Sequence, residues 1–148
     1  MTKTPDSGHL VDPEILPALE FFPDLDIDQG SIGALRQTAS EALPPLEAYA
    51  DLGAELERIV VPGDSETSPV GVILHRPQGV SGKLPLFLHI HGGGYVFGEA
   101  LGNVAGNVRT AIEVGCVVAS VDYRLAPEAQ GTDAVEDCYR ALAWLLDN

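Results

Sequence analysis

The N-terminal third of the chain spaces its apolar residues for helices. In residues 12–22, and again in 31–43, apolar side chains recur three and four positions apart, which is the period of an amphipathic helix. Pro44 and Pro45 follow the second stretch, and proline cannot continue a helix. The pattern therefore predicts two short helices over these ranges, with their acidic side chains on the solvent face.

The middle of the chain spaces its apolar residues for strands. Residues 56–61 and 70–74 are short runs rich in β-branched side chains, and the turn residues 62–64 follow the first run, which predicts an antiparallel hairpin. Residues 84–90 and 117–121 are almost continuously apolar, as in strands that are covered on both faces of an α/β sheet. About four strands are therefore expected, a hairpin first and parallel strands after it.

Two further helices are predicted beside these strands. Residues 104–112 have helical spacing and Gly115 follows them as a C-terminal cap, which gives a strand–helix–strand unit and an α/β fold. Asp133, with Glu136 three residues later, is interpreted as the capping pair that begins the last helix. The expected buried stripe of that helix consists of Val135, Cys138, Leu142 and Leu145.

Composition limits the partners and the location of the protein. The 148 residues carry 22 acidic and 8 basic side chains, a net charge of −14, which argues against nucleic acid and anionic membranes as partners. No stretch approaches the roughly 20 consecutive apolar residues of a membrane span, and residues 1–10 lack the apolar run of a signal peptide. Cys116 and Cys138 fit neither a disulfide framework nor a zinc site. We expect a cytoplasmic protein without a metal or cofactor.

The segment most informative about chemistry is the run H-G-G-G-Y at 91–95, directly after an apolar strand. Three consecutive glycines remove every Cβ, so backbone N–H groups can point into a cavity and a ligand can approach the chain closely. Such donors can stabilise negative charge that develops on an oxygen in a transition state. A tight turn remains the alternative interpretation of the glycines taken alone.

Nucleotide binding is disfavoured by spacing. Counted from Gly92, the sixth position of a dinucleotide fingerprint is Phe97 instead of glycine. A phosphate-binding loop needs Ser or Thr after Gly-Lys, and the pair Gly82-Lys83 is followed by Leu84.

A second motif gives the glycine run its context. H-G-G-G-Y-V-F-G at 91–98 is followed by V-D-Y-R-L-A-P-E at 121–128, and the last helix contains A-L-A-W-L at 141–145. Together these motifs resemble the hormone-sensitive-lipase-like family of α/β-hydrolase fold carboxylesterases. The resemblance implies N-terminal cap helices over residues 1–50 and the N-terminal half of an α/β-hydrolase domain, a partial sheet, over residues 51–148.

The resemblance also implies roles for the motif residues. The backbone N–H groups of Gly92, Gly93 and Gly94 would form the oxyanion hole for the tetrahedral intermediate of ester hydrolysis. His91 would orient the glycine loop, because the catalytic histidine of the family lies far downstream. The residues expected to act as an ion-pair and turn framework for the loop after the second strand of the parallel pair are Asp122, Tyr123, Arg124 and Glu128.

Three aromatic residues near the glycines have less specific expectations. Tyr95 and Phe97 are candidates for the lining of an acyl or alcohol pocket, with ordinary core packing as the alternative. His89 is interpreted as a hydrogen-bonded core residue.

The sequence departs from the family in two respects. Residues 129–133 read A-Q-G-T-D where the family shows H-P-F-P-A, so the rigid prolines are missing from that loop. No catalytic triad is recognisable: Gly-x-Ser-x-Gly occurs nowhere, and the nearest similar segment, around Ser65, has Thr67 in place of the closing glycine. In the family the nucleophile lies on the strand after the last helix predicted here.

The expected function follows from what is present and what is missing. We expect the chain to supply the oxyanion hole of a serine carboxylesterase for small uncharged esters, and to be inactive alone. Without the next strand, residues 84–90 would be an open apolar edge with Lys83 at its start, suited to a homodimer or to a chain carrying the C-terminal half. A non-catalytic binding or scaffold protein, and the remnant of an interrupted gene, remain alternatives.

Overall fold

A four-stranded mixed sheet with the strand order β1-β2-β4-β3 forms the centre of the structure. The computed structural model describes residues 10–19, 27–28, 30–64 and 67–148. The strands are β1 (Ala54–Val61), β2 (Val70–Pro77), β3 (Leu86–Ile90) and β4 (Val117–Asp122). β2 pairs antiparallel with both β1 and β4, whereas β3 and β4 are parallel. The predicted hairpin and the predicted parallel pair are confirmed, and β3 lies at one edge of the sheet.

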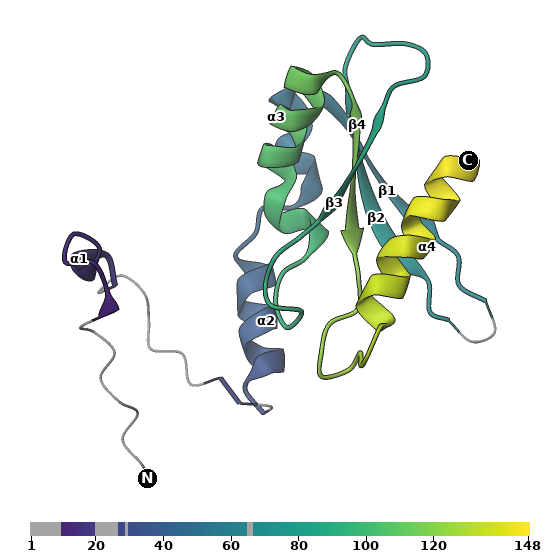
Figure 1. Ribbon diagram of the computed structural model, residues 1–148. Coiled ribbons are helices and arrows are strands. Elements are labelled where there is room, and N and C mark those ends of the chain that lie inside the picture. The colour runs from purple at the N-terminus through teal and green to yellow at the C-terminus, as the bar shows by residue number, and fades with distance from the viewer. Residues whose placement is uncertain (1–9, 20–26, 29, 65–66) are drawn as a thin grey trace.

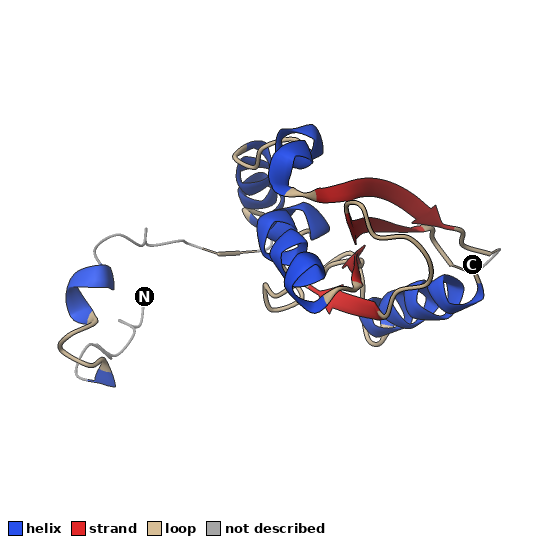
Figure 2. Ribbon diagram, turned by 90° about the horizontal axis from the view of Figure 1, so that it is seen from above, coloured by secondary structure: helices blue, strands red, loops and turns tan. Residues whose placement is uncertain are grey.

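Helices cover both faces of this sheet (Figures 1 and 2). α3 (Val104–Val114), preceded by the 3-10 turn Ala100–Asn103, packs on one face, and α4 (Asp133–Asp147) packs on the other. The 3-10 helix Leu46–Leu52 joins the core on the α3 side. In Figure 1, α2 (Ile32–Glu41) lies below α3, beside the chain that leaves β3. The layers are those of an α/β protein.

Alternation along the strands assigns each side chain to one of the two cores. On the α4 side, Val72 of β2 and Val121 of β4 pack with Cys138 and Ala141. On the α3 side, Ile73 of β2 packs with Val104 and Val108 of the helix. Because each strand of the parallel pair is flanked by helices, its sequence is almost continuously apolar, as predicted.

Several local predictions are confirmed. The second predicted helix is α2, and Gly115 ends α3 with a φ of 71° while its N–H donates to the carbonyl of Ala111 at 3.0 Å. Cys116 and Cys138 are both buried free thiols. Burial raises the pKa of the Cys138 thiol to about 11. Within the described ranges, no helix combines the length and the apolar character needed to cross a bilayer.

The first predicted helix is shorter than expected. α1 comprises only Leu16–Leu19, whereas apolar spacing suggested residues 12–22. Positions 20–22 of that prediction lie outside the described residues. The side chains of residues 12–18 are exposed, so no tertiary packing extends the helix in the N-terminal direction.

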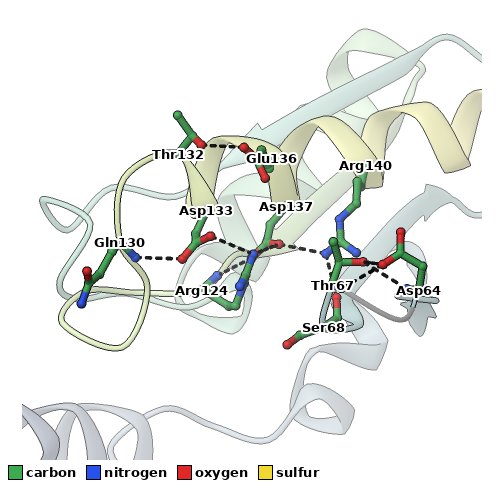
Figure 3. Close-up of polar contacts among 10 residues, drawn as sticks. All are labelled: Asp64, Thr67, Ser68, Arg124, Gln130, Thr132, Asp133, Glu136, Asp137 and Arg140. Atoms are coloured by element: carbon green, nitrogen blue, oxygen red, sulfur yellow. Dashed lines mark hydrogen bonds and ion pairs between the residues drawn. The ribbon is translucent and has the colours of Figure 1, made fainter.

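Two details of α4 were predicted wrongly. Thr132 occupies the N-cap position, so Asp133 is the first helical residue and not the partner of a capping pair. The Thr132 hydroxyl donates to Glu136 at 2.5 Å, and the Asp133 carboxylate accepts from the Gln130 N–H at 2.8 Å (Figure 3). Val135 is 59% exposed, because the helix presents other residues to the sheet. Of the expected stripe, Cys138 is buried, and Leu142 and Leu145 are half-buried.

Candidate functional site

The loop of residues 91–98, called the glycine loop below, begins where β3 ends. It lies at the carboxyl end of the parallel strand pair, the position where open α/β sheets bind ligands. Figure 1 shows this end of β3 beside α2. The backbone of Gly92, Gly93 and Gly94 is exposed, whereas His91 at the start of the loop is buried.

Two positions of the glycine loop have no room for a side chain. Gly93 has a φ of 126°, and a Cβ there would lie 2.0 Å from the carbonyl oxygen of Phe97. Gly98 has a φ of 97°, and its Cβ would lie 2.4 Å from Nδ1 of His91. Gly94 and Tyr95 also have positive φ, both 62°. The loop is thus a tight turn that only glycine can form at these two positions.

The first two peptide groups of the loop are held through their carbonyl oxygens. The hydroxyl of Tyr123 donates to the carbonyl of His91 at 2.7 Å. The His91 ring donates from Nδ1 to the carbonyl of Gly92 at 2.9 Å, which requires the proton to be on Nδ1 because a carbonyl only accepts. The two rings also stack, with centroids 4.2 Å apart and planes inclined by 13°.

The third peptide group is held by the turn itself. The carbonyl of Gly93 accepts from the N–H groups of Val96, at 3.1 Å, and Phe97, at 2.9 Å. In a trans peptide the C=O and the N–H point in opposite directions. Fixing three successive carbonyls therefore also fixes the next three N–H groups, which belong to Gly92, Gly93 and Gly94.

These three N–H groups are available to a ligand. Within the described part of the chain, none of them donates to a protein acceptor. Because all three residues are exposed, an oxygen atom from a substrate can approach their backbone without displacing a side chain. A set of fixed, unshared N–H donors can bind a carboxylate or stabilise a developing oxyanion.

The two candidate pocket residues line different cavities. Tyr95 is 60% exposed and borders a small cavity of about 110 Å³ whose other walls include Ile90, Tyr123 and Cys138. Phe97 is half-buried and borders a larger cavity, of about 420 Å³, between α2 and the glycine loop. The structure does not bring the two aromatic rings into one pocket.

The three charged residues expected to form a framework each bind a different partner. Asp122 accepts from the N–H of Ala100 at 2.5 Å, at the start of the turn before α3. Glu128 forms an ion pair of 2.8 Å with Arg36 of α2. Arg124 binds the α4 carboxylates. None of the three pairs with another member of the set.

Arg124 is part of a charged network beneath the loop that follows β4. Its side chain donates twice to the carboxylate of Asp137, at 2.8 and 2.9 Å, and its N–H donates at 3.0 Å. Arg140 donates to the same carboxylate at 2.9 Å and to the carbonyl of Ser68 at 2.7 Å (Figure 3). Burial acts to raise the pKa of Asp137, but these donors outweigh it and the pKa is lowered.

A serine and a histidine meet on the α3 side of the sheet, but not as a catalytic pair. Nδ1 of His89 lies 2.9 Å from the hydroxyl of Ser120, and Asn103 and Asn107 contact the same ring. Ser120 is fully buried, so no substrate reaches its hydroxyl. Ser65 lies outside the described residues. The described residues bring together no group of three His, Cys, Asp or Glu side chains that could hold a metal ion.

Sequence reasoning missed Asp137 and Arg36. A signal for Asp137 was present in the sequence: it is a charged residue directly before the buried Cys138, on the inner side of an amphipathic helix. Arg36 gave no such signal, because two of its three acceptors are backbone carbonyls 60 and 90 residues away along the chain.

The comparisons with known proteins agree with the fold described above. Residues 87–148 match the model of a family described as having the alpha/beta hydrolase fold. The whole chain is 33% identical to esterase LipI of Mycobacterium tuberculosis and covers 45% of that protein. A segment covering 48% of the chain is 39% identical to 9% of hormone-sensitive lipase of Bos taurus.

Solved structures give the same result. Esterase LipW of Mycobacterium marinum superposes with a TM-score of 0.76 at 28% identity, over 98% of this chain and 45% of that one. A bacterial heroin esterase superposes with a TM-score of 0.72 at 34% identity, over 91% and 42%. The protein thus has part of an α/β-hydrolase fold. The relatives that it matches include esterases and hormone-sensitive lipase, and the resemblance to the hormone-sensitive-lipase-like family is confirmed. The chain spans less than half the length of LipI.

Proposed function

We propose that this chain supplies the oxyanion hole of a serine-type carboxylic ester hydrolase. The observation that carries the proposal is the row of three N–H groups at Gly92, Gly93 and Gly94, each fixed by a hydrogen bond to the carbonyl of the same peptide group. The esterase relatives support the reaction class.

The chemistry assigned to the loop is charge stabilisation. When a serine attacks an ester, the carbonyl oxygen becomes an oxyanion in the tetrahedral intermediate. Donors that are already aimed at this oxygen need no reorganisation during the reaction, and losing one such donor typically lowers kcat about 100-fold or more. Because the glycine loop is held by Tyr123, His91 and its own turn, its donors are preorganised in this sense.

The catalytic serine, its base and the orienting acid are proposed to come from outside these 148 residues, which contain no Gly-x-Ser-x-Gly. β3 offers a place for the strand that carries the serine, because β4 pairs with only one of its edges and the other edge lies at the rim of the sheet. The carboxyl end of a strand added there would adjoin the glycine loop.

The substrate is proposed to be a small uncharged ester. The described walls of the cavity beside Tyr95 consist of apolar and aromatic side chains, Tyr123 among them, with no formal charge. The net charge of −14 disfavours anionic substrates. We also propose a cytoplasmic location, which the two buried free thiols support.

A chimera tests the proposal. This chain would be joined to the part of LipI that it does not match, and the product assayed with a fluorophosphonate probe and p-nitrophenyl butyrate. In the labelled chimera, Gly93→Ala should lower kcat about 100-fold. Gly102→Ala is the matched control, because a Cβ there meets nothing within 4 Å.

Two results would contradict the proposal. One is a labelled chimera in which Gly93→Ala hydrolyses the ester as fast as the parent. The other is labelling of the 148-residue chain by itself, which would place the nucleophile inside it. A chain that binds acetate at the glycine amides, and whose chimera never hydrolyses an ester, would instead favour a binding protein.

A further inference from the structure

Arg36 of α2 reaches three backbone or side-chain acceptors in two loops that follow strands. Its Nε donates to the carbonyl of Val96 at 2.7 Å, in the glycine loop. Its Nη2 donates to the carbonyl of Ala126, and its Nη1 pairs with the carboxylate of Glu128 at 2.8 Å. The side chain of Arg36 is only 21% exposed, although the residue lies on a helix with few buried positions.

The two loops that Arg36 contacts are also joined to each other. The N–H of Ala126 donates to the carbonyl of Tyr95 at 2.8 Å. Tyr95 and Val96 therefore have their successive carbonyls fixed from outside the glycine loop, one by the loop after β4 and one by α2. The guanidinium of Arg36 links the two loops a second time, because it donates to the carbonyls of Val96 and Ala126 at once.

Apolar packing does little to fix α2 at this point. Ile32 is the buried residue of α2, one helical turn before Arg36. A cavity of about 420 Å³ is lined by Ala39 of α2, by Leu43 just beyond the end of the helix and by Phe97 of the glycine loop. Beside this cavity, directional hydrogen bonds from Arg36 join the helix to the loop.

We propose that Arg36 is a positioning residue that couples the position of α2 to the position of the oxyanion donors. The carbonyl of Val96 shares a peptide group with the N–H of Phe97, which donates to the carbonyl of Gly93. That carbonyl in turn shares a peptide group with the N–H of Gly94. Arg36 thus fixes a donor of the proposed oxyanion hole across two peptide groups, and the catalytic meaning of this coupling rests on the proposed function.

Lysine cannot replace arginine in this position. Three acceptors lie around the guanidinium in different directions, and its planar group of five N–H donors reaches all of them from one rotamer. A lysine ammonium is a compact point charge, which we expect to pair with Glu128 and to release the two carbonyls.

Amide hydrogen exchange on the 148-residue chain tests the coupling without any catalysis. Arg36→Met should raise the exchange rates of the Val96 and Phe97 amides about tenfold or more. Both amides donate to the carbonyl of Gly93, and without Arg36 the turn that aligns these two hydrogen bonds would open more often. The amides of β4 should change much less. Arg109→Met is the matched control, since Arg109 is 77% exposed and pairs only within α3, with Glu113. Equal exchange at Val96 and Phe97 in Arg36→Met and the parent would overturn the proposal.

A second variant covers the case in which Arg36→Met unfolds the chain and all amides exchange alike. Arg36→Lys keeps the charge and should loosen the same two amides while β4 stays protected. Glu128→Gln keeps both carbonyl contacts and should leave the two amides protected. Loosening in Glu128→Gln but not in Arg36→Lys would show that the ion pair holds the loop and would overturn the proposal.

The chimera with LipI gives a readout that a purely structural role would not move. Arg36→Lys should lower kcat and kcat/KM about equally and change KM little, as expected for a contact that acts only in the transition state. If Gly93→Ala has no effect on hydrolysis, the proposed function fails while the exchange result for Arg36 still stands. If exchange is unaffected, the inference about Arg36 fails and the proposed function does not.

Discussion

Tyr123 and His91 contact each other in two ways: their rings stack at 4.2 Å, and the hydroxyl of Tyr123 donates to the carbonyl of His91 at 2.7 Å. The stacking holds the imidazole where its Nδ1 reaches the carbonyl of Gly92. The hydroxyl fixes the peptide group just before it. Burial raises the pKa of Tyr123, so the hydroxyl keeps its proton and remains a donor through the neutral range.

Tyr123→Phe separates these two contacts, because phenylalanine keeps the stacking and loses the donor. We expect a loss of about 1 kcal/mol in the free energy of unfolding, the usual value of one hydrogen bond. Tyr139→Phe is the control, since Tyr139 is 70% exposed. Urea unfolding curves compare the variants, and equal midpoints for Tyr123→Phe and the parent would contradict the prediction.

Gly98→Ala should break the contact between His91 and Gly92. The new Cβ would lie 2.4 Å from Nδ1 of His91 and 2.5 Å from the carbonyl of Gly92, at a φ of 97°. Left-handed strain and overpacking together should cost about 2–4 kcal/mol of stability. Gly92→Ala is the control, because its Cβ meets nothing within 4 Å. A Gly98→Ala variant as stable as Gly92→Ala would show that the loop can rearrange freely.

Asp137→Asn should be among the most damaging single changes in α4. Asp137 is fully buried, and its carboxylate accepts from Arg124 and Arg140. The amide accepts on one atom only and leaves two cations facing a neutral group, which we expect to cost about 2–4 kcal/mol. Glu113→Gln removes an exposed ion pair and should cost less than about 0.5 kcal/mol. Chemical unfolding at pH 7 measures both.

The same carboxylate makes the fold sensitive to strong acid. Its pKa is lowered in the folded state, so the unfolded chain binds this proton first as the pH falls. The stability that Asp137 contributes is therefore complete above its ordinary pKa of 3.8 and is lost as the pH drops below that value. In Asp137→Asn the corresponding part of the acid dependence should disappear.

His75 and His89 predict a second pH dependence, at milder pH. Burial lowers the pKa of both rings from the usual 6.5. The unfolded chain therefore binds more protons just below pH 6.5, and stability should fall as the pH drops from 7.5 to 5.5. His89→Gln should reduce this slope. Urea midpoints that do not change over that interval would contradict the prediction.

The parts of the fold that sequence could predict are those decided by local apolar spacing. The hairpin and the β3–α3–β4 unit follow from runs such as Leu84–Ile90, because strands buried between helices must be apolar along their whole length. Val135 shows the limit of this reasoning. Helical spacing places it on the apolar stripe, but the way α4 sits on the sheet, which spacing does not specify, leaves it exposed.

The candidate site shows the same division. The motif 91–98 located the donors, since consecutive glycines after a strand are recognisable in any sequence. The contacts that hold them were not predictable, because the acceptors are backbone carbonyls such as those of Val96 and Ala126. A carbonyl is present at every residue, so the sequence carries no mark of which one an arginine on a distant helix will bind.

We propose that the free edge of β3 is an association surface. Phe87 and Ile90 on this strand are 48% and 52% exposed, and the strand carries no Asp, Glu, Lys or Arg. The opposite edge, β1, exposes Glu55, Glu57 and Arg58, charges of the kind that discourage pairing. The rim of β3 is thus the edge that can accept another strand.

Phe87→Lys should reduce association of the chain, and light scattering at about 100 μM measures it. Val60→Lys is the matched control, since Val60 is an exposed apolar residue of β1. It should leave the scattered mass unchanged. A parent chain that remains a monomer at this concentration would contradict the proposal.

The unequal charges of β1 and β3 also determine how far such assembly can go. A sheet with two open edges can recruit copies without end, as a filament does. Here β1 is protected by its charges, so among the described strands pairing through β3 would use one edge of each copy and stop. Two copies joined in this way would form an open eight-stranded sheet with a charged strand at each edge, and that pairing would compete directly with any strand that brings in a serine.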